Sequence, residues 1–594
     1  MKSILKMFLN PIKNEFPFLI CIYFLLIPRT LFFFICNPQR WFDNFEQFPT
    51  LRFLALSLLY SYFLTILAYK IKWIKFFVYI VLYLLFFANI YLAINFNAAI
   101  SPNSLLLLFE TTTAEIQDFL YTYAFSVRSY IAYASLLLII SLNIYFDSKR
   151  DQISVWITTK LPSIYKKSLI ILFFLFFLGG VYELRLFPQL FSCKSIEEVD
   201  KWNPVGKASM DIITNFIMSL YDLHLMGEVL SKAIEATNQI NKGQSSYNWG
   251  DDSCNVILVI GESFIKNHSS LYGYYLKTNP RLEKEKDSGR LFVFTNVITS
   301  IANTSTSVRN MLSCNSIGNG EKWYEYPYFP AIFKQTGYKV YFWDNQFKPT
   351  SNASYDFSLN AYIHGNKIVE LSYDAEQGQV SMLDEELVDH FVEHCKTNPL
   401  ERLNFAIFHL QGQHFAPKNR YPHNGEFDLF KSSDIKRKET WLTERKKQKI
   451  AEYDNCTLYN DSVIYKILEL YKCENTIVVY LSDHSETVYD VGDYTGRRLD
   501  LTSKDPQLIH QFNDIPFVVW CSDLYMKKHP DIVYALQQST SKPMMADNLC
   551  HMLMRLGGIK SNYYNKDRDI LSETYSCPPR IVYDSIYYDK LADR

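Results

Sequence analysis

The sequence predicts a protein of two parts: an N-terminal α-helical transmembrane domain with five spans, followed by an α/β domain with a largely parallel sheet. Two observations carry this prediction. The first 185 residues are dense in leucine, isoleucine, phenylalanine and tyrosine, whereas the remainder has the composition of an ordinary globular protein. From Cys254 onward, apolar strand-like segments alternate with helical segments, a pattern typical of a parallel sheet covered by helices.

Composition and charge bound the class of protein. The chain has 594 residues, with 60 lysines and arginines against 61 aspartates and glutamates. Nucleic-acid-binding proteins normally carry a basic surplus, so the near-zero net charge argues against a nucleic-acid partner. A hydrophobic content of 48% excludes a disordered chain. We expect a transmembrane domain over 1–185, a linker with amphipathic helices over 186–250 and a globular domain over 251–594.

Five apolar runs in the first part are close in length to the roughly 20 residues that a helix needs to cross a bilayer. The runs are 16–36, 51–69, 73–95, 130–146 and 168–182. Buried helices of a soluble core are the alternative, but five such runs exceed what one soluble core holds. We therefore interpret them as membrane spans, the first being a retained anchor rather than a cleaved signal peptide.

The positive charges predict an orientation for these spans. Lysine and arginine residues precede the first run and gather again in the loops between the second and third runs and between the fourth and fifth. These residues are Lys2, Lys6, Lys13, Lys70, Lys72, Lys75, Lys149, Arg150, Lys160, Lys166 and Lys167. Loops rich in lysine and arginine stay in the cytoplasm. We therefore expect a cytoplasmic N-terminus and, after five crossings, a globular domain outside the cytoplasm.

The predicted outer loop 95–129 contains two polar residues at helical spacing. Thr111 and Glu115 are four residues apart, which puts them on one face of a helix if the segment is helical. The alternative is an ordinary helix start, with a threonine cap and an acid near the positive end of the dipole. From the residues alone, the ordinary helix start is the favoured reading.

Acidic and histidine residues stand at the predicted strand ends of the globular domain. Glu262 follows the apolar strand 255–261, and Asp483 and His484 follow the strand 476–482. His414 lies a few residues beyond a third strand. In parallel sheets the functional site lies beyond the carboxyl ends of the strands. Each residue alone would be an ordinary hydrogen-bonded loop residue, but together they favour a divalent cation such as zinc.

A segment rich in hydroxyl groups, 299–313, runs into a predicted helix. A hydroxyl at a helix N-terminus sees the positive end of the dipole, which stabilises an alkoxide and a transferred phosphate. Simple N-capping by serine or threonine is the alternative. The residue pattern by itself leaves Thr304, Ser305 and Thr306 as equal candidates for a nucleophile.

Several short motifs recur in one order from about 254 to 575. They are 256–263 (VILVIGES), 270–274 (SLYGY), 278–280 (TNP), 337–340 (GYKV), 345–346 (NQ), 409–414 (HLQGQH), 420–422 (RYP), 453–455 (YDN), 459–461 (YND), 482–484 (SDH) with Glu486, and 515–517 (IPF). This set resembles the membrane-bound phosphoethanolamine transferases of the alkaline-phosphatase/sulfatase-like superfamily. The resemblance implies an alkaline-phosphatase/sulfatase-like periplasmic domain on a five-span membrane anchor.

The resemblance also implies roles for individual residues. Glu262, Asp483 and His484 match the zinc ligands of the family, and Thr304 matches the nucleophile, which also contacts the metal. His414 matches a histidine that contacts the phosphoryl group. Thr111 and Glu115 resemble a pair in the outer loop where the lipid substrate is thought to sit. Many members carry another histidine a dozen or so residues after the Asp-His pair, but the stretch 492–497 contains none.

By this resemblance, the chain transfers phosphoethanolamine from phosphatidylethanolamine to lipopolysaccharide, at a lipid A phosphate or a core sugar, through a covalent intermediate on Thr304. The implied location is the cell inner membrane, with many crossings and the catalytic domain in the periplasm. The alternative is a glycerol-phosphate transferase that uses phosphatidylglycerol, as in lipoteichoic-acid synthesis, or a related membrane phosphodiesterase. A sulfatase activity is disfavoured, because no Cys/Ser-x-Pro-x-Arg run occurs at Thr304.

Overall fold

The computed structural model divides the chain into two compact units, Met1–Glu228 and Val229–Arg594. The boundary falls within one long helix, α13 (Ile212–Asn238). This helix passes through the segment for which the sequence predicts a linker, and the boundaries of that linker stay a prediction. The structure describes residues 2–28, 49–96, 100, 127–160, 162–194, 198–199, 210–240, 245–249, 253–318, 320–346, 362–377, 381–414, 417–497, 501, 505–583 and 585–591.

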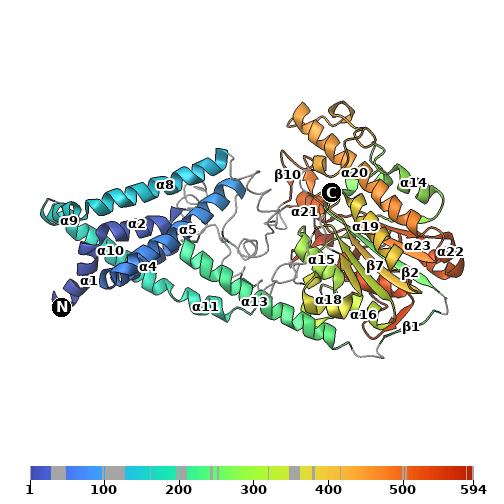
Figure 1. Ribbon diagram of the computed structural model, residues 1–594, viewed down its shortest axis with the longest axis horizontal. Coiled ribbons are helices and arrows are strands. Elements are labelled where there is room, and N and C mark those ends of the chain that lie inside the picture. The colour runs from blue at the N-terminus through green and yellow to red at the C-terminus, as the bar shows by residue number, and fades with distance from the viewer. Residues whose placement is uncertain are drawn as a thin grey trace. The chain divides into compact units, whose positions relative to one another are not determined.

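The first unit is built from helices (Figure 1). Before α13 they are α1 (Lys2–Asn14), α2 (Phe16–Leu26), α4 (Pro49–Lys70), α5 (Lys72–Phe96), α8 (Val127–Ser148), α9 (Arg150–Thr159), α10 (Ser163–Glu183) and α11 (Leu186–Ser192). Helix α4 packs against α10, and α5 packs against α8. A Cβ added to Gly180 of α10 would come within 2.5 Å of the Ala55 carbonyl oxygen on α4. Small residues permit this close approach of membrane helices.

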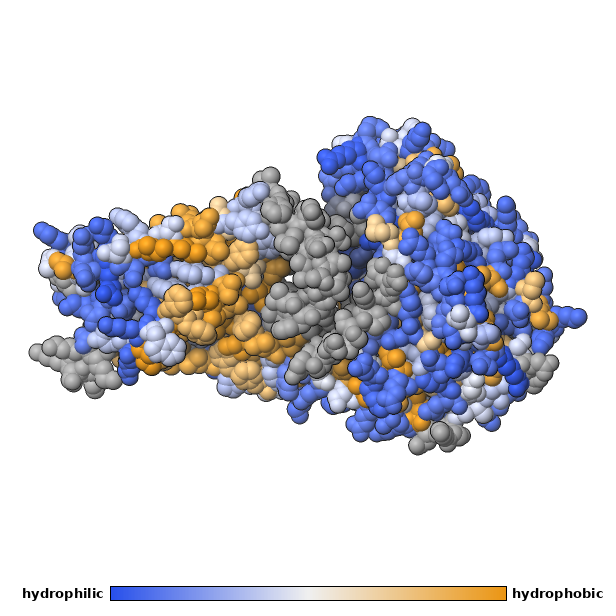
Figure 2. Space-filling model, viewed as in Figure 1, coloured by the Kyte–Doolittle hydropathy of each residue, from blue (hydrophilic) through white to orange (hydrophobic). Residues whose placement is uncertain are grey.

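Four described helical segments are long and apolar enough to cross a membrane: Leu51–Lys70, Lys72–Ile94, Ser129–Ser148 and Ser163–Ser192. They overlap the last four predicted runs. The first predicted run overlaps α2, which is shorter, and residues 29–36 of that run lie outside the described residues. The helices of this unit expose large apolar side chains, which give the unit its hydrophobic surface in Figure 2. This surface is typical of helices that face lipid.

The second unit is an α/β domain around a seven-stranded sheet with the strand order β3-β11-β8-β2-β7-β5-β6. Neighbouring strands from β8 to β6 are parallel, whereas β11 runs antiparallel to both β8 and β3. The predicted, largely parallel sheet is therefore confirmed. The strands are β2 (Cys254–Gly261), β3 (Leu291–Phe294), β5 (Lys339–Asp344), β6 (Ala375–Gln377), β7 (Leu403–His409), β8 (Thr476–Ser482) and β11 (Phe517–Cys521).

Helices and short strand pairs complete this unit. The helices are α14 (Pro280–Asp287), α15 (Thr304–Leu312), α16 (Phe329–Gln335), α18 (Asn366–Ser372), α19 (Asp384–Thr397), α20 (Glu444–Leu470), α21 (Pro506–Asn513), α22 (Asp523–Lys528), α23 (Pro530–Ser539) and α24 (Leu549–Leu556). The short strands pair as β1 (Ser245–Tyr247) with β13 (Ile559–Ser561), β4 (Val297–Ile298) with β12 (Met544–Met545), β9 (Thr487–Val488) with β10 (Thr495–Gly496), and β14 (Ile581–Val582) with β15 (Ile586–Tyr587).

The central strands are buried on both faces. In β2, Leu258 packs into one hydrophobic cluster with residues of α16 and α24, and Val259 packs into a second cluster with residues of α19 and α20. All eight residues of β2 and all seven of β8 are buried. A parallel strand covered on both faces is apolar throughout. The ionisable residues that directly follow β2 and β8 stand at the carboxyl edge of the sheet, where the candidate site lies.

Candidate metal centre

The turn after β2 fixes the position of Glu262. Gly261 ends the strand so close to β8 that an added Cβ would lie 2.3 Å from the Tyr480 hydroxyl. Ser263 then takes a left-handed conformation, with φ of 57°. Its hydroxyl donates to Glu262 Oε1 at 2.7 Å, and the Glu262 side chain is fully buried. The sharp turn therefore presents this carboxylate at the end of the sheet.

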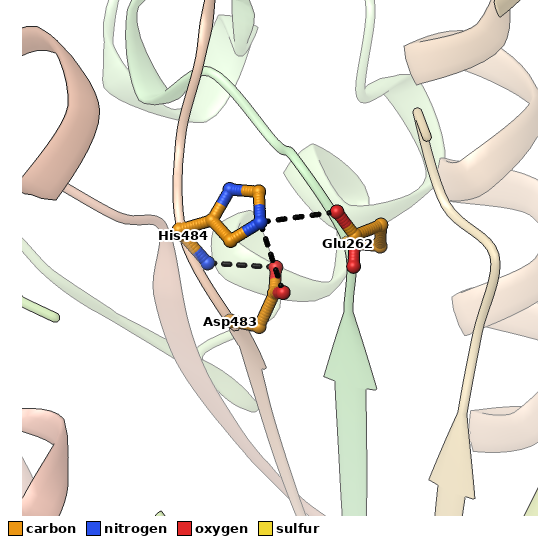
Figure 3. Close-up of side chains that lie close together, drawn as sticks. All are labelled: Glu262, Asp483 and His484. Atoms are coloured by element: carbon orange, nitrogen blue, oxygen red, sulfur yellow. Dashed lines mark hydrogen bonds and ion pairs between the residues drawn. The ribbon is translucent and has the colours of Figure 1, made fainter. Parts of the chain in front are cut away.

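Asp483 and His484 lie level with Glu262 because β8 and β2 are parallel neighbours, with Ser482 opposite Gly261. Asp483 Oδ1 accepts from the backbone N–H groups of Ser263, at 3.2 Å, and His484, at 2.7 Å. Figure 3 shows the His484 ring nitrogen Nε2 facing both carboxylates, 3.1 Å from Glu262 Oε1 and 3.2 Å from Asp483 Oδ2.

Thr304 is the first residue of α15 and joins this group. Its hydroxyl donates to Glu262 Oε2 at 2.9 Å and lies 3.2 Å from His484 Nε2. Asn303 caps the helix by accepting from the backbone N–H of Thr306 at 3.1 Å. One turn further along α15, the Ser307 hydroxyl donates to the Asp483 carbonyl oxygen. The helix start is therefore tied directly to the loop that carries two of the predicted ligands.

The side chains present fit a divalent cation. His484 Nδ1 lies 3.0 Å from the Ser485 carbonyl oxygen, to which it donates, so Nε2 keeps its lone pair for a ligand. The second oxygen of Asp483, Oδ2, is buried and accepts no hydrogen bond from the described part of the chain. One ligand atom from each of Glu262, Asp483 and His484 lies within 4.8 Å of the others. Zinc ligands at about 2.0 Å in a tetrahedron stand about 3.3 Å apart, close to the 2.9–3.2 Å separations at this site.

The electrostatics of the site also favour a cation. Burial and the neighbouring charge of Glu262 raise the pKa of the Asp483 carboxyl well above its ordinary value. Burial lowers the pKa of His484, which keeps the imidazole neutral and able to bind a metal. Two buried carboxylates facing one lone pair repel each other unless a positive charge lies between them.

His414 reaches the same edge of the sheet through the turn after β7. The turn presses against Glu262: Gln413 donates its backbone N–H to the Glu262 carbonyl oxygen at 3.0 Å, and Gly412 adopts a φ of +50°. A Cβ on Gly412 would lie 2.8 Å from backbone atoms of Glu262. His414 is half-buried, and burial lowers its pKa. Its contact with a phosphoryl group stays a prediction.

Thr111 and Glu115, predicted to contact the lipid substrate, lie outside the described residues. Their role also stays a prediction.

Arg497 and Gln346 also contact the site, and the sequence assigned no role to either. Arg497 lies 3.4 Å from Glu262 Oε1 and also donates to His484 Nε2. Arg497 comes thirteen residues after His484, at the end of the stretch 492–497, where many members of the family carry a histidine. Gln346, from the loop after β5, donates to Glu262 Oε2 at 3.2 Å and to the Leu410 carbonyl oxygen at 2.7 Å. The sequence held a signal for each residue. Arg497 stands in the stretch where many members of the family carry a histidine, and Gln346 is part of the 345–346 motif.

An α/β domain with acidic and imidazole ligands and a hydroxyl at the carboxyl edge of its sheet defines a class of metal-dependent hydrolases and transferases. The chain belongs to the sulfatase family, whose family model matches residues 254–559. It is 28% identical over 359 residues to the phosphoethanolamine transferase EptC of Escherichia coli (strain K12), a match that covers 58% of this chain and 59% of that one. The phosphoethanolamine transferase EptA of Helicobacter pylori (strain 26695) is 28% identical over 287 residues, 46% of this chain and 49% of that one. The chain thus spans less than two thirds of the length of these curated relatives.

Solved structures agree with the fold. The C-terminal periplasmic domain of EptC from Escherichia coli superposes with a TM-score of 0.50 at 27% identity, over 58% of this chain and 96% of that one. The integral membrane lipooligosaccharide phosphoethanolamine transferase A (EptA) from Neisseria meningitidis superposes with a TM-score of 0.58 at 19% identity, over 93% of this chain and 97% of that one. A helical part with four candidate membrane spans, joined to a sulfatase-like α/β domain, is therefore confirmed as the fold class.

Proposed function

We propose that the chain transfers phosphoethanolamine from phosphatidylethanolamine to lipopolysaccharide, at a lipid A phosphate or a core sugar. One observation carries the proposal: the Thr304 hydroxyl, at a helix N-terminus, contacts both Glu262 and His484. A hydroxyl held against metal ligands and a helix dipole is poised for phosphoryl transfer. Relatives that are named phosphoethanolamine transferases support the choice of donor group.

Zinc is the cation that we propose for this site. Two carboxylates and one imidazole, with the Thr304 oxygen beside them, provide four donor atoms of the kinds that zinc binds in four-coordinate sites. When bound by Glu262, Asp483, His484 and Thr304, zinc supplies Lewis acidity that lowers the pKa of the hydroxyl and offsets negative charge at phosphorus.

The residues of the chain then have separate roles in a two-step transfer. Glu262 Oε2 accepts the proton of the Thr304 hydroxyl, to which it is already hydrogen-bonded. The Thr304 oxygen forms a bond to phosphorus, the bond from phosphorus to the diacylglycerol oxygen breaks, and the leaving oxygen takes the proton that Glu262 holds. In the second step the hydroxyl oxygen of the acceptor bonds to the same phosphorus and its proton passes to Glu262. The bond from phosphorus to the Thr304 oxygen breaks, and that oxygen takes the proton from Glu262. Backbone N–H groups at the start of α15, together with His414 and Arg497, balance the charge on the phosphoryl oxygens in both steps.

The membrane part explains how insoluble substrates reach this site. We propose five spans with the N-terminus in the cytoplasm, domain boundaries at 1–185, 186–250 and 251–594, and the catalytic domain in the periplasm against the inner membrane. The arrangement of positive charges between the spans supports this orientation. Thr111 and Glu115 would then contribute to a lipid-binding loop on the outer side.

The test uses the purified full chain in mixed micelles, with head-group-labelled phosphatidylethanolamine or phosphatidylglycerol as donor and lipopolysaccharide as acceptor. We expect diacylglycerol release and label transfer from phosphatidylethanolamine, loss of both in Thr304→Ala, and retention of both in the matched control Thr306→Ala. Preferential use of phosphatidylglycerol would overturn the proposal in favour of a glycerol-phosphate transferase. Full activity of Thr304→Ala would overturn the assignment of the nucleophile.

A further inference from the structure

A cavity of about 400 Å³ lies in the catalytic unit beside the metal-ligand cluster. This volume falls within the range of about 300–1,000 Å³ that is typical of small-molecule sites. The mechanism above makes no use of the cavity. Residues that line it include Asn267, Trp441, Ser485, Asp490, Gln507 and Gln511.

Hydrogen bonds connect the residues that line this cavity to the loop that carries two of the proposed metal ligands. Ser485 directly follows the ligand His484, and its backbone N–H donates to the Phe512 carbonyl oxygen at 3.0 Å. Gln511 Nε2 donates to the Glu486 carbonyl oxygen at 2.8 Å, so α21 is held against the loop after β8. A group bound in the cavity therefore lies next to the loop that carries two of the metal ligands.

Asn513, at the end of α21, connects the same wall to the nucleophile helix. Its side-chain amide donates to the Thr299 carbonyl oxygen at 2.9 Å. The Thr299 hydroxyl is in turn 2.7 Å from the Ser307 hydroxyl of α15. Helix α21 is thereby linked both to the ligand loop and to the segment that leads into Thr304.

The charged groups in the lining are already matched by opposite charges. Lys266 Nζ is 2.9 Å from Asp514 Oδ2. Asp490 Oδ1 is 2.7 Å from the Arg437 guanidinium and 3.0 Å from the His268 ring. These ion pairs leave little net charge to attract a phosphate or an ammonium group, since a charged ligand needs an uncompensated partner to repay its desolvation.

The remaining lining suits a neutral ligand with many hydroxyl groups. The side-chain amides of Asn267 and Gln507 each offer donors and an acceptor. Gln511, which uses one N–H on Glu486, keeps its amide oxygen as an acceptor, and Ser485 adds a hydroxyl. Trp441 donates its indole N–H to the Tyr489 carbonyl oxygen at 3.3 Å, so its ring supplies apolar surface to the wall. Amides that bond to adjacent hydroxyls, with an aromatic surface for C–H groups, are the chemistry that recognises a sugar ring.

We propose that this cavity binds a neutral sugar ring of the acceptor and so brings an acceptor oxygen to the site of transfer. The statement that this sugar belongs to the acceptor rests on the proposed function. The binding of a sugar by the cavity is a separate property, and it is measured without the donor.

The binding test uses the full chain in detergent and labelled N,N′-diacetylchitobiose, a neutral disaccharide, as the probe in equilibrium dialysis. We expect Gln507→Ala to weaken binding about fivefold through the loss of one hydrogen bond. Trp441→Leu should weaken it at least as much through the lost aromatic contact. The control Gln538→Ala, at an exposed glutamine of α23, should bind like the wild type. Absence of disaccharide binding, or equal affinity in the Gln507→Ala and Gln538→Ala variants, would overturn the proposal.

A second measurement separates this proposal from the proposed function. Release of diacylglycerol from phosphatidylethanolamine reports the donor step, and label on lipopolysaccharide reports the acceptor step. We expect the ratio of transfer to donor cleavage to fall in Gln507→Ala and to stay at the wild-type value in Gln538→Ala. A wild-type chain that binds the disaccharide but does not cleave the donor refutes the proposed function and leaves the sugar site standing. An unchanged ratio in Gln507→Ala refutes the role of the cavity in placing the acceptor and leaves the proposed function standing.

Discussion

Replacement of His268 by glutamine tests how the segments that follow β2 and β8, which carry the proposed metal ligands, are held together. His268 lies in the loop after β2, is 2% exposed, and places Nδ1 2.6 Å from Asp454 Oδ1 on α20. Its Nε2 is 3.0 Å from Asp490 Oδ1, in the turn between β9 and β10. With a carboxylate at each ring nitrogen, both nitrogens donate and the ring is a buried imidazolium. His268→Gln removes this charge while keeping a side chain of similar length.

The size of the effect follows from the pKa of this ring. Burial alone would lower the pKa of His268, but Asp454 and Asp490 raise it from the ordinary 6.5 to about 10. Because the pKa is raised in the folded state, the stabilisation is complete below pH 6.5 and is lost as the pH rises through about 10. At about 1.4 kcal/mol per pKa unit, the imidazolium contributes about 4 kcal/mol at pH 7 and about 1 kcal/mol at pH 9. Removal of one partner from a buried ion pair typically costs a similar amount, about 3–5 kcal/mol.

The assay is urea unfolding of the full chain in a non-ionic detergent, followed by near-ultraviolet circular dichroism at pH 7 and pH 9. The matched control is His423→Gln, which removes an exposed histidine 2.9 Å from Asp428 and should cost less than about 1 kcal/mol. The reasoning is refuted if His268→Gln costs no more than this control at pH 7. It is equally refuted if the cost does not shrink between pH 7 and pH 9.

Three further substitutions probe the contacts around the metal ligands. Gln346→Leu should weaken zinc affinity about tenfold in a chelator competition, because the Glu262 carboxylate loses a hydrogen bond. The control Gln538→Leu should leave the affinity unchanged. Equal zinc affinities in the two variants would contradict the role of Gln346 in orienting Glu262. Gly412→Ala should lower the transfer rate far more than Gly425→Ala. Both glycines have positive φ, but of the two only Gly412 would bring a Cβ within 2.8 Å of backbone atoms. Equal losses of rate in the two variants would exclude the clash as the cause. Arg497→Ala should slow turnover about a hundredfold, with partial recovery in Arg497→Lys, and a wild-type rate in the alanine variant would remove Arg497 from the site.

The sequence located three members of the candidate site because of how parallel strands are buried. Strands β2 and β8 are buried along their whole length and mostly apolar, so Glu262, Asp483 and His484 stand out as the first ionisable residues after each strand. Adjacent parallel strands end at the same edge of the sheet, so these residues can be expected to lie together even when the paths of the loops are not known. The periodicity of residues did not separate Thr304 from its neighbours, because that choice depends on where the helix begins.

The contacts that escaped prediction involve loops distant in the sequence. Arg497 returns to the site only after the short β9–β10 pair, and Gln346 arrives from the loop after β5. Such loop paths depend on tertiary packing rather than on a local repeat. The His268 ion pairs join segments more than 180 residues apart in the chain, which no local pattern encodes. In the membrane part, the four long apolar helices were predictable because a bilayer sets their length and composition.

The central claim is that Thr304 carries the phosphoethanolamine group between donor and acceptor. The most direct measurement is tandem mass spectrometry of the full chain after incubation with phosphatidylethanolamine and rapid acid quenching, without acceptor. We predict a phosphoethanolamine adduct on Thr304, which disappears when lipopolysaccharide is added before the quench and is absent in Thr304→Ala. An adduct on a different residue, or continued transfer to lipopolysaccharide by Thr304→Ala, would contradict the account.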